Sequence, residues 1–325
     1  MPSGEDDLIA RYFKPLATAP GALGLTDDAA ILQAGGDDIV VTVDAVVEGV
    51  HFLPDDPSDT VARKALRVNL SDLAAKGAEP AGFVLTLALR EVSEAWLAPF
   101  ARALGEDAHQ FGCPLLGGDT VSTPGPAMIS ITAFGLVPPG RIVRRGSATP
   151  GDLVVVSGTI GDAVLGLSIL KGDAGPLGYD AEAREVLTGR YRVPQPRIAL
   201  AGAVRGHAAA AMDISDGLMG DLAKMCRASG VSAVVDVAAI PLSQPARTWL
   251  AADAGIIKRL VSGGDDYELL CAVPENRFAA FEARAQSAGV PVSIIGRIVA
   301  GEGAPQLRAA DGREMPLDRQ SYSHF

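Results

Sequence analysis

The 325-residue chain has little cysteine and little histidine, and both shortages exclude kinds of chemistry. Its three cysteines, Cys113, Cys226 and Cys271, are widely spaced and have apolar neighbours. Isolated cysteines in odd number predict buried thiols in a reducing cytoplasm rather than disulfides or a zinc site. None of the four histidines is paired at a metal-binding spacing, and no G-x-S-x-G motif is present. Zinc hydrolysis and serine nucleophile chemistry are therefore disfavoured.

Positive charge is also scarce, because 39 acidic residues face 28 lysines and arginines and the net charge is −11. A nucleic-acid-binding protein normally carries a basic stripe, and none is visible. No apolar run reaches the length of a membrane span, and residues 1–7 are short and acidic, unlike a secretory signal. The sequence therefore predicts neither a nucleic-acid partner nor a membrane partner.

Two phosphate-binding motifs are missing as well. The chain has no G-x-x-x-x-G-K-[S/T] loop and no protein-kinase catalytic loop. A bound nucleotide would therefore be held by metal, backbone amides and arginine rather than by a P-loop lysine.

What is present indicates a mixed α/β protein of two domains. The length suffices for two cores, 48% of the residues are hydrophobic, and 37 glycines supply turns. Pro138-Pro139-Gly140 is the predicted linker, so the expected domains are residues 1–139 and 140–325. Strands are predicted at residues 39–43, 83–89, 114–116, 128–137, 153–156, 232–237, 267–273 and 292–298. Helices are predicted at residues 3–13, 57–76, 93–110, 163 onward, 181–187 and 275–287.

Acidic residues recur where predicted strands end or in short loops. They are Asp27, Asp28, Asp44, Asp72, Asp119, Asp213 and Asp216. Carboxylate oxygens are the ligands that Mg²⁺ prefers, so the set indicates a site for a hard cation. Each aspartate taken alone is equally explained as a turn residue or a helix N-cap.

The predicted helix over residues 57–76 has two distinct faces. Ala62, Leu66, Leu70 and Leu73 form an apolar stripe that predicts the side packed on the core. Asn69 and Asp72 share another face with the helical spacing of neighbours. That face is either part of the acidic site or simply solvated.

The loop of residues 157–162, Ser-Gly-Thr-Ile-Gly-Asp, lies between a predicted strand and a predicted helix. Backbone N–H groups in such a loop can bind a phosphate at the helix N-terminus. Loops of this kind also connect strands to helices without any ligand.

Eight motifs in order carry a resemblance along nearly the whole chain: GEDDLIARYF, TDDAA, TVDAVVEGVHF, NLSDLAAKGAEP, GGDT, DISDGL, GGDDYEL and a closing Y-x-HF. The series resembles the thiamine-monophosphate kinase family of the aminoimidazole ribonucleotide synthetase superfamily. The resemblance implies an N-terminal α/β domain whose strands form a barrel with those of a second subunit, followed by a C-terminal α/β domain. It also implies a homodimer that uses ATP, thiamine monophosphate and several Mg²⁺ ions.

Matching the motifs position by position implies roles for individual residues. The implied Mg²⁺ ligands are Asp28, Thr42, Val43, Asp44, Asp72, Asp119, Asp213 and Asp216. The implied ATP contacts are Gly118, Asp119, Arg145 and Ser215. The implied contacts to thiamine monophosphate are His51, Asp265 and Tyr322.

Three positions depart from the family pattern. Val43 stands where the family usually has threonine, so only its carbonyl could serve as a ligand. Asp265 stands where glutamate is commoner, which puts a direct substrate contact in doubt. The ATP-binding arginine could be Arg144 instead of Arg145.

The implied reaction is direct, in-line phosphoryl transfer from ATP to thiamine monophosphate, with no catalytic residue beyond the metal ligands. Two alternatives remain at this point. One is another ATP-using enzyme of the superfamily, such as a selenophosphate synthetase or a hydrogenase-maturation protein. The other is a non-catalytic protein that binds Mg²⁺-nucleotide.

Overall fold

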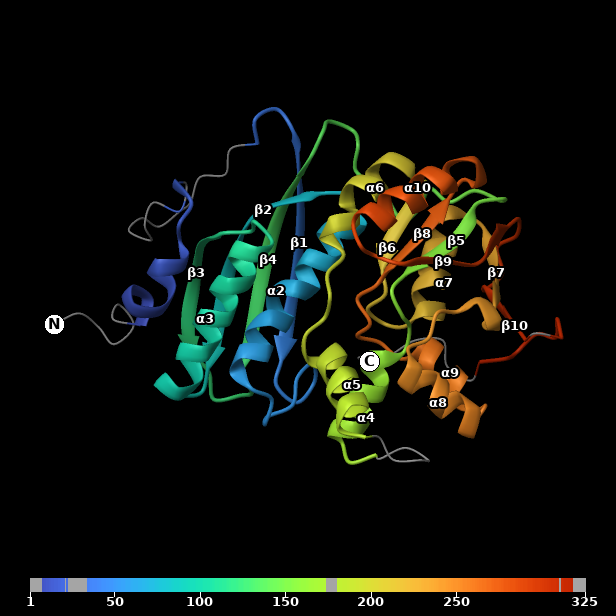
Figure 1. The fold of residues 1–325 in the computed structure, drawn as a ribbon. Helices are drawn as coiled ribbons and strands as arrows, with labels where there is room; N and C mark the ends of the chain where they lie inside the picture. The colour runs from blue at the N-terminus through green and yellow to red at the C-terminus, as the bar shows by residue number, and fades with distance from the viewer. Residues whose placement is uncertain (1–7, 21, 23–33, 174–179, 310, 318–325) are drawn as a thin grey trace. The chain divides into compact units, whose positions relative to one another are not determined.

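A computed structural model of the chain describes residues 8–20, 22, 34–173, 180–309 and 311–317. The chain divides into two compact units (Figure 1). The first unit holds residues 1–73 and 78–141, and the second holds residues 74–77 and 142–325. The predicted mixed α/β class is confirmed.

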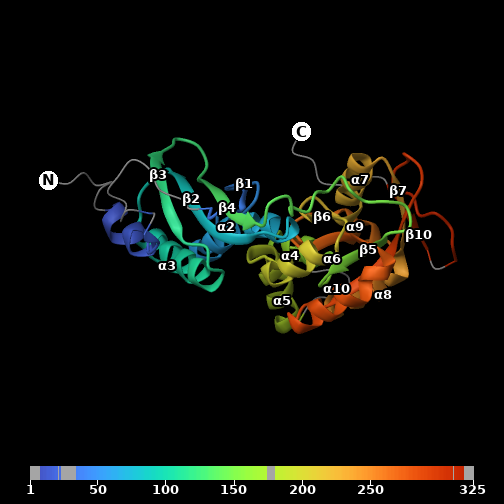
Figure 2. The ribbon, with the colours of Figure 1, turned by 90° about the horizontal axis from the view of Figure 1, so that it is seen from above.

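The first unit is one four-stranded sheet with helices on one face. Its elements are η1 (Ile9–Phe13), η2 (Lys14–Leu16), β1 (Asp38–Val47), α2 (Ser58–Ala75), β2 (Glu79–Leu89), α3 (Glu94–Gln110), β3 (Leu115–Ser122) and β4 (Met128–Val137). The strand order is β1-β4-β2-β3, with β2 and β3 parallel and the other pairs antiparallel. Figures 1 and 2 both show α2 and α3 on the same side of this sheet. The described residues form no closed barrel, because β1 and β3 are open edges.

Alternation along β4 shows which sheet face is covered. Its odd-numbered residues are buried, whereas its even-numbered ones are only half-buried. The predicted stripe of α2 is buried completely, with Ala62, Leu66, Leu70 and Leu73 at 0% exposure. The helices therefore cover one face, and the described part of the chain leaves the other face partly open.

The second unit is a six-stranded sheet with helices on both faces. Its strands are β5 (Leu153–Ser157), β6 (Ala210–Asp213), β7 (Ser232–Asp236), β8 (Leu269–Val273), β9 (Val292–Val299) and β10 (Gln306–Arg308), in the order β10-β7-β9-β5-β8-β6. Its helices are α4 (Asp162–Leu170), α5 (Ala181–Arg192), η4 (Ile198–Leu200), α6 (Ala201–His207), α7 (Leu218–Ser229), η5 (Val237–Ala239), α8 (Gln244–Ala252), α9 (Ile256–Ser262) and α10 (Glu275–Ser287).

Alternate residues of β5 enter two separate cores of this unit. Val154 and Val156 pack in a core with residues of α4, α7, α8 and α9. Leu153 and Val155 pack in a second core with residues of α6 and α10. Both faces of a central strand are thus covered, which explains its uniformly apolar sequence.

The three cysteines are buried and unpaired, as predicted. Burial raises the pKa of Cys113 and Cys271 to about 12 and that of Cys226 to about 11. These thiols are therefore protonated at neutral pH and unreactive. Among the described helices, none combines the length and the hydropathy that crossing a bilayer requires.

Among the predicted strand ends that differ from the structure, two concern candidate ligands. Asp44 lies inside β1, since pairing with β4 continues as far as Val47 opposite Met128. Asp119 lies inside β3, because parallel pairing with β2 continues to Ser122 opposite Leu89. Polar residues and glycines at a sheet edge therefore belong to strands here, since a partner strand supplies the hydrogen bonds.

Candidate functional site

In the first unit, α2 and β1 bring Thr42 and Asp72 together. The Thr42 hydroxyl donates a hydrogen bond to the Asp72 carboxylate. Asp72 is half-buried, and Ala74 and Leu73 beside it on α2 are fully buried. The helix thus anchors the carboxylate while one side of it faces outward, as a ligand for a cation requires.

Asn69 connects the same helix to Asp44. Its side-chain oxygen accepts a hydrogen bond from the Asp44 backbone N–H at 3.0 Å, and its amide group donates to the Ala65 carbonyl at 3.0 Å. Asn69 is completely buried, so the interpretation of this face as merely solvated is wrong for it. The Asp44 side chain and neighbouring Val43 are exposed.

Asp119 and Gly118 lie on the opposite edge strand, β3, and are exposed. The strands β4 and β2 separate β3 from β1. Three strand spacings amount to roughly 14 Å along the sheet, so the first unit does not bring Asp119 into contact with Asp44.

His51 is held by two hydrogen bonds in the turn after β1. Its Nδ1 accepts from the Val47 N–H at 3.0 Å, and its carbonyl accepts from the Lys64 ammonium at 2.8 Å. An imidazole whose Nδ1 accepts carries its proton on Nε2, which is then a donor. Lys64 itself is 1% exposed, and its burial escaped the sequence reasoning, because only the fold encloses it.

In the second unit, Asp213 ends β6, and the turn that follows contains Ser215 and Asp216. The buried Asp221 carboxylate accepts hydrogen bonds from the backbone N–H groups of Ser215 and Asp216 at 3.0 and 2.9 Å. Burial raises the pKa of Asp221, an effect that its hydrogen bond to Lys224 opposes. Asp221 therefore shapes the turn that presents Asp216.

Lys224 forms ion pairs with both Asp216 and Asp221, at 2.5 and 2.7 Å. Burial lowers the pKa of Lys224, but the hydrogen bonds to the two carboxylates outweigh it and leave that pKa above its ordinary value. Lys224 was not among the predicted site residues, although its spacing of three residues from Asp221 on a helix was a usable signal.

Arg144 and Arg145 both expose their side chains. Their backbone carbonyls are fixed, since Arg144 accepts from the Ala211 N–H at 3.4 Å and Arg145 from the Ser229 hydroxyl at 3.2 Å. The geometry favours neither arginine as a ligand of ATP.

Asp265 occupies strained backbone between α9 and β8. Asp265 and Tyr267 have φ angles of +72° and +50°, the two positive values among the described non-glycine residues. Such conformations each cost about 1–3 kcal/mol and cluster at functional sites. Their N–H groups donate to the carbonyls of Ser215 and Ile214, both at 2.8 Å. The segment is therefore joined to the turn that carries Asp216.

Two carboxylates that were not among the predicted site residues alternate with these strained residues. Asp266 is 1% exposed and Glu268 is 0% exposed. Burial raises the pKa of Asp266 well above its ordinary value. A usable signal was that Asp266 and Glu268 stand at the start of an otherwise apolar, strand-like run that ends at Val273.

The hydrogen bonds of the loop at residues 157–162 favour a structural connection over a phosphate site. The N–H groups of Gly158 and Ile160 donate to the carbonyls of Pro291 and Pro241, at 3.0 and 2.9 Å. The Gly161 N–H donates to the Asp266 carboxylate at 2.8 Å. Protein acceptors thus occupy three of the N–H groups that a phosphate could use.

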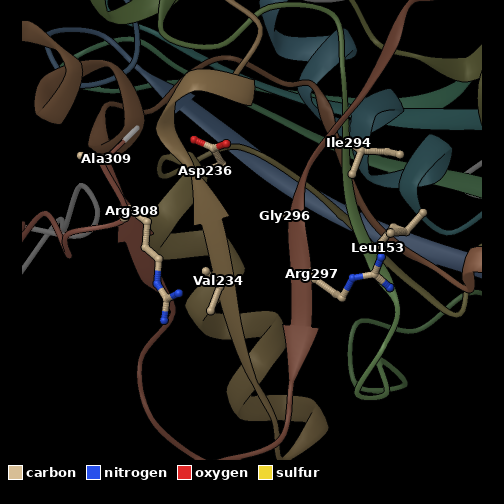
Figure 3. Close-up of a pocket in the computed structure, with 9 residues that line it drawn as sticks. Leu153, Val234, Asp236, Ile294, Gly296, Arg297, Arg308 and Ala309 are labelled. Carbon is tan, nitrogen blue, oxygen red and sulfur yellow. The ribbon is translucent and has the colours of Figure 1, made fainter.

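A groove of about 470 Å³ lies over β7, β9 and β10 (Figure 3). Arg297 and Arg308 line it beside Asp236. Glu275, which does not line the groove, pairs with Arg297 at 3.0 Å, so Glu275 and Asp236 together offset the charges of the two arginines. The groove therefore has no excess charge that would attract an anion, and none of the predicted ligands lines it.

The donor set fits a hard cation but is incomplete by itself. Within the described ranges, no three His, Cys, Asp or Glu side chains lie close enough together to hold a metal ion. Mg²⁺ commonly uses one or two carboxylates and takes its other ligands from water and substrate phosphates. The oxygen-only groups Thr42–Asp72, Asp44 and Asp213 suit that mode. Asp28 and Tyr322 lie outside the described residues.

Comparisons with known proteins agree along the entire chain. Residues 26–137 match the N-terminal domain of AIR synthase related proteins, and residues 149–306 match the C-terminal domain. A thiamine-monophosphate kinase of Caulobacter vibrioides is 46% identical, over 99% of this chain and 91% of that protein.

Two solved structures are similar as well. The crystal structure of a thiamine-monophosphate kinase from Stenotrophomonas maltophilia has a TM-score of 0.83 and 37% identity, covering 95% of this chain and 96% of that one. The structure of AaThiL complexed with AMPPCP and TMP has a TM-score of 0.78 and 30% identity, covering 92% and 91%. The chain therefore belongs to the thiamine-monophosphate kinase family of AIR synthase related proteins.

Proposed function

We propose that the protein transfers the γ-phosphoryl group of ATP to the phosphate of thiamine monophosphate, giving thiamine diphosphate and ADP. The full-length identity of 46% to a thiamine-monophosphate kinase carries this proposal. The reaction belongs in the cytoplasm, where ATP is available and buried thiols stay reduced.

Mg²⁺ ions would be held by the acidic groups of the two units. In the first unit these are Thr42, Asp44, Asp72 and Asp119, with the Val43 carbonyl and Asp28; in the second they are Asp213 and Asp216. Bound Mg²⁺ neutralises phosphate charge and aligns the transferred group. Gly118, Asp119, Ser215 and Arg145 or Arg144 would contact ATP.

The acceptor needs no catalytic base. A phosphate monoester has its second pKa near ~6, so it is already ionised at pH 7. His51 supports this interpretation, because its Nδ1 is occupied by the Val47 N–H and its Nε2 is a donor. His51 therefore binds the acceptor, together with Asp265 and Tyr322, and removes no proton.

Two copies of the chain would join through the first unit. Ile39, Val41 and Val43 on β1 are 44%, 57% and 61% exposed. Val41 lies opposite the half-buried Phe134 on β4, so an apolar surface continues across neighbouring strands. A second copy of this sheet would cover that surface and give the barrel that the family resemblance implies.

The direct test is incubation of the purified protein with ATP, Mg²⁺ and thiamine monophosphate. We expect thiamine diphosphate and ADP in equal amounts. Nucleotide binding without product would favour the non-catalytic alternative instead.

Thiamine itself tests the absence of a base. Its hydroxyl must lose a proton to attack, so we expect it to be a very poor acceptor beside its monophosphate. We also expect no labelled protein after incubation with γ-labelled ATP. Efficient phosphorylation of thiamine, or a phosphoenzyme that passes its phosphate to the acceptor, would contradict direct transfer.

A further inference from the structure

The segment of residues 265–268 alternates strained backbone with buried carboxylates. Asp265 and Tyr267 have positive φ angles, and between and after them come the buried side chains of Asp266 and Glu268. Only Asp265 of these four has a side chain that is not buried. The segment thus holds three buried side chains and one half-buried carboxylate, that of Asp265.

Glu268 connects the segment of residues 265–268 to two other parts of the unit. Its carboxylate accepts hydrogen bonds from Arg190 Nη2 and Arg197 Nε, both at 2.7 Å, and from the Ser157 hydroxyl at 2.5 Å. Arg190 is near the end of α5, and Ser157 is the last residue of β5. Arg197 also donates through Nη2, so its contact with Glu268 is bidentate.

Asp266 ties the segment to a third element. Its carboxylate accepts from the N–H groups of Gly161 and Ala163 at the start of α4, at 2.8 and 3.5 Å. The space around Glu268 is filled, since a Cβ atom added at Gly158 would lie 2.1 Å from the Glu268 carboxylate. The backbone at Gly158 therefore leaves no room for a larger residue beside the Glu268 carboxylate.

A buried ion pair is a poor means of adding stability, because apolar residues of similar size often do as well or better. It does specify one geometry, and bidentate pairing with arginine is directional. The strained backbone at Asp265 needs such over-determination by its surroundings. A role in geometry accounts for these contacts better than a role in stability.

We propose that Glu268, held by Arg190 and Arg197, is a positioning residue. It fixes Asp265 for binding the acceptor molecule, thiamine monophosphate. This inference rests on the proposed function, in which Asp265 contacts thiamine monophosphate. Glu268 acts through the backbone of the segment and does not touch the substrate.

The test compares Glu268→Gln with Glu275→Gln. Both changes remove one carboxylate paired with arginine in the second unit, but the Glu275–Arg297 pair is exposed. For Glu268→Gln we expect the KM for thiamine monophosphate to rise about tenfold, with the KM for ATP and kcat within about twofold, because ground-state binding of one substrate is lost. Glu275→Gln should change none of these.

Hydrogen exchange gives a readout that does not depend on activity. Amides of residues 262–268 should exchange faster in Glu268→Gln than in Glu275→Gln. The weaker hold on Glu268 lets the backbone open more often, which breaks the hydrogen bonds from the Asp265 and Tyr267 N–H groups to the Ser215 and Ile214 carbonyls. Arg197→Met should raise the KM for thiamine monophosphate. Arg197→Lys keeps a charged donor, so it should raise that KM less.

An equal rise in both KM values, or unchanged exchange in this segment, would overturn the positioning role. Should Glu268→Gln fail to fold, Ser157→Ala removes one hydrogen bond to Glu268 and is judged by the same two readouts. Failure of the wild-type protein to form thiamine diphosphate would overturn the proposed function. Normal wild-type turnover with an unchanged acceptor KM in the variants would overturn the positioning role alone.

Discussion

At the scale of single residues, Asp72 links the fold most directly to the proposed chemistry. It accepts a hydrogen bond from Thr42 and lies off the buried stripe of α2. Asp72→Asn should abolish turnover, because an amide is a weaker ligand for Mg²⁺ than a carboxylate. The free energy of unfolding should change by only about 1 kcal/mol, a typical value for a point mutant. Steady-state kinetics at saturating Mg²⁺ and denaturant unfolding measure the two effects.

Asp59→Asn is the matched control for this change. Asp59 lies in the first turn of the same helix, more than three turns before the residue that Thr42 contacts. We expect it to retain turnover. Turnover near the wild-type level in Asp72→Asn would remove Asp72 from the ligand set.

Asp266 predicts a pH dependence of stability. Burial raises its pKa in the folded state, so the folded protein binds this proton more tightly than the unfolded chain does. The contribution of protonated Asp266 to the free energy of unfolding is fully present below the unfolded pKa of about 3.9. It is lost as the pH rises through the folded pKa. The neutral amide introduced by Asp266→Asn would mimic the protonated carboxyl group, so the stability of this variant would not fall in the same way as the pH rises.

The stability of Asp266→Asn relative to wild type should therefore improve as the pH rises above about 4. Denaturant unfolding of both proteins at a series of pH values measures this difference. A difference that is independent of pH would show that Asp266 has no raised pKa.

At the scale of secondary-structure elements, Gly118 has a structural role beside its implied contact with ATP. A Cβ atom at Gly118 would lie 2.0 Å from the backbone oxygen of Leu85 on the paired strand β2. Gly118→Ala should therefore destabilise the protein by roughly 1–3 kcal/mol or more, the usual cost of overpacking. Thermal unfolding gives the measurement.

Gly117→Ala is the control, since no atom lies within 4 Å of the Cβ position at Gly117. We expect it to unfold like the wild type. If Gly118→Ala were equally stable but bound ATP more weakly, the nucleotide contact alone would explain this glycine.

At the scale of the whole molecule, the open sheet face of the first unit predicts the oligomeric state. The wild-type protein should sediment as a dimer at micromolar concentration, because β1 exposes Ile39, Val41 and Val43. Val41→Asp should dissociate it, since a buried unpaired charge opposes association. Val186→Asp, at a 46% exposed position of α5 in the other unit, is the control and should remain dimeric. A monomeric wild-type protein would refute this surface as an interface.

Much of the fold was predictable, because it follows from local patterns. The stripe from Ala62 to Leu73 repeats with the helical period and is buried completely. The apolar run of β5 predicted a buried strand, and its alternate residues do enter two cores. The motif series identified the family on its own, because eight short motifs in one order along the chain are highly specific.

Side-chain partners were not predictable, because they depend on residues distant in the sequence. Glu268 meets Arg190 and Arg197 across more than seventy residues, and Asp266 meets Gly161 across 105. Asp119 was expected in a loop, but pairing with β2 makes it part of a strand. The sequence by itself determined the fold class, the buried helix stripe and the family, since these depend on local periodicity and residue order. Only the tertiary structure decided which carboxylates are buried and paired, because burial depends on every element packed around them.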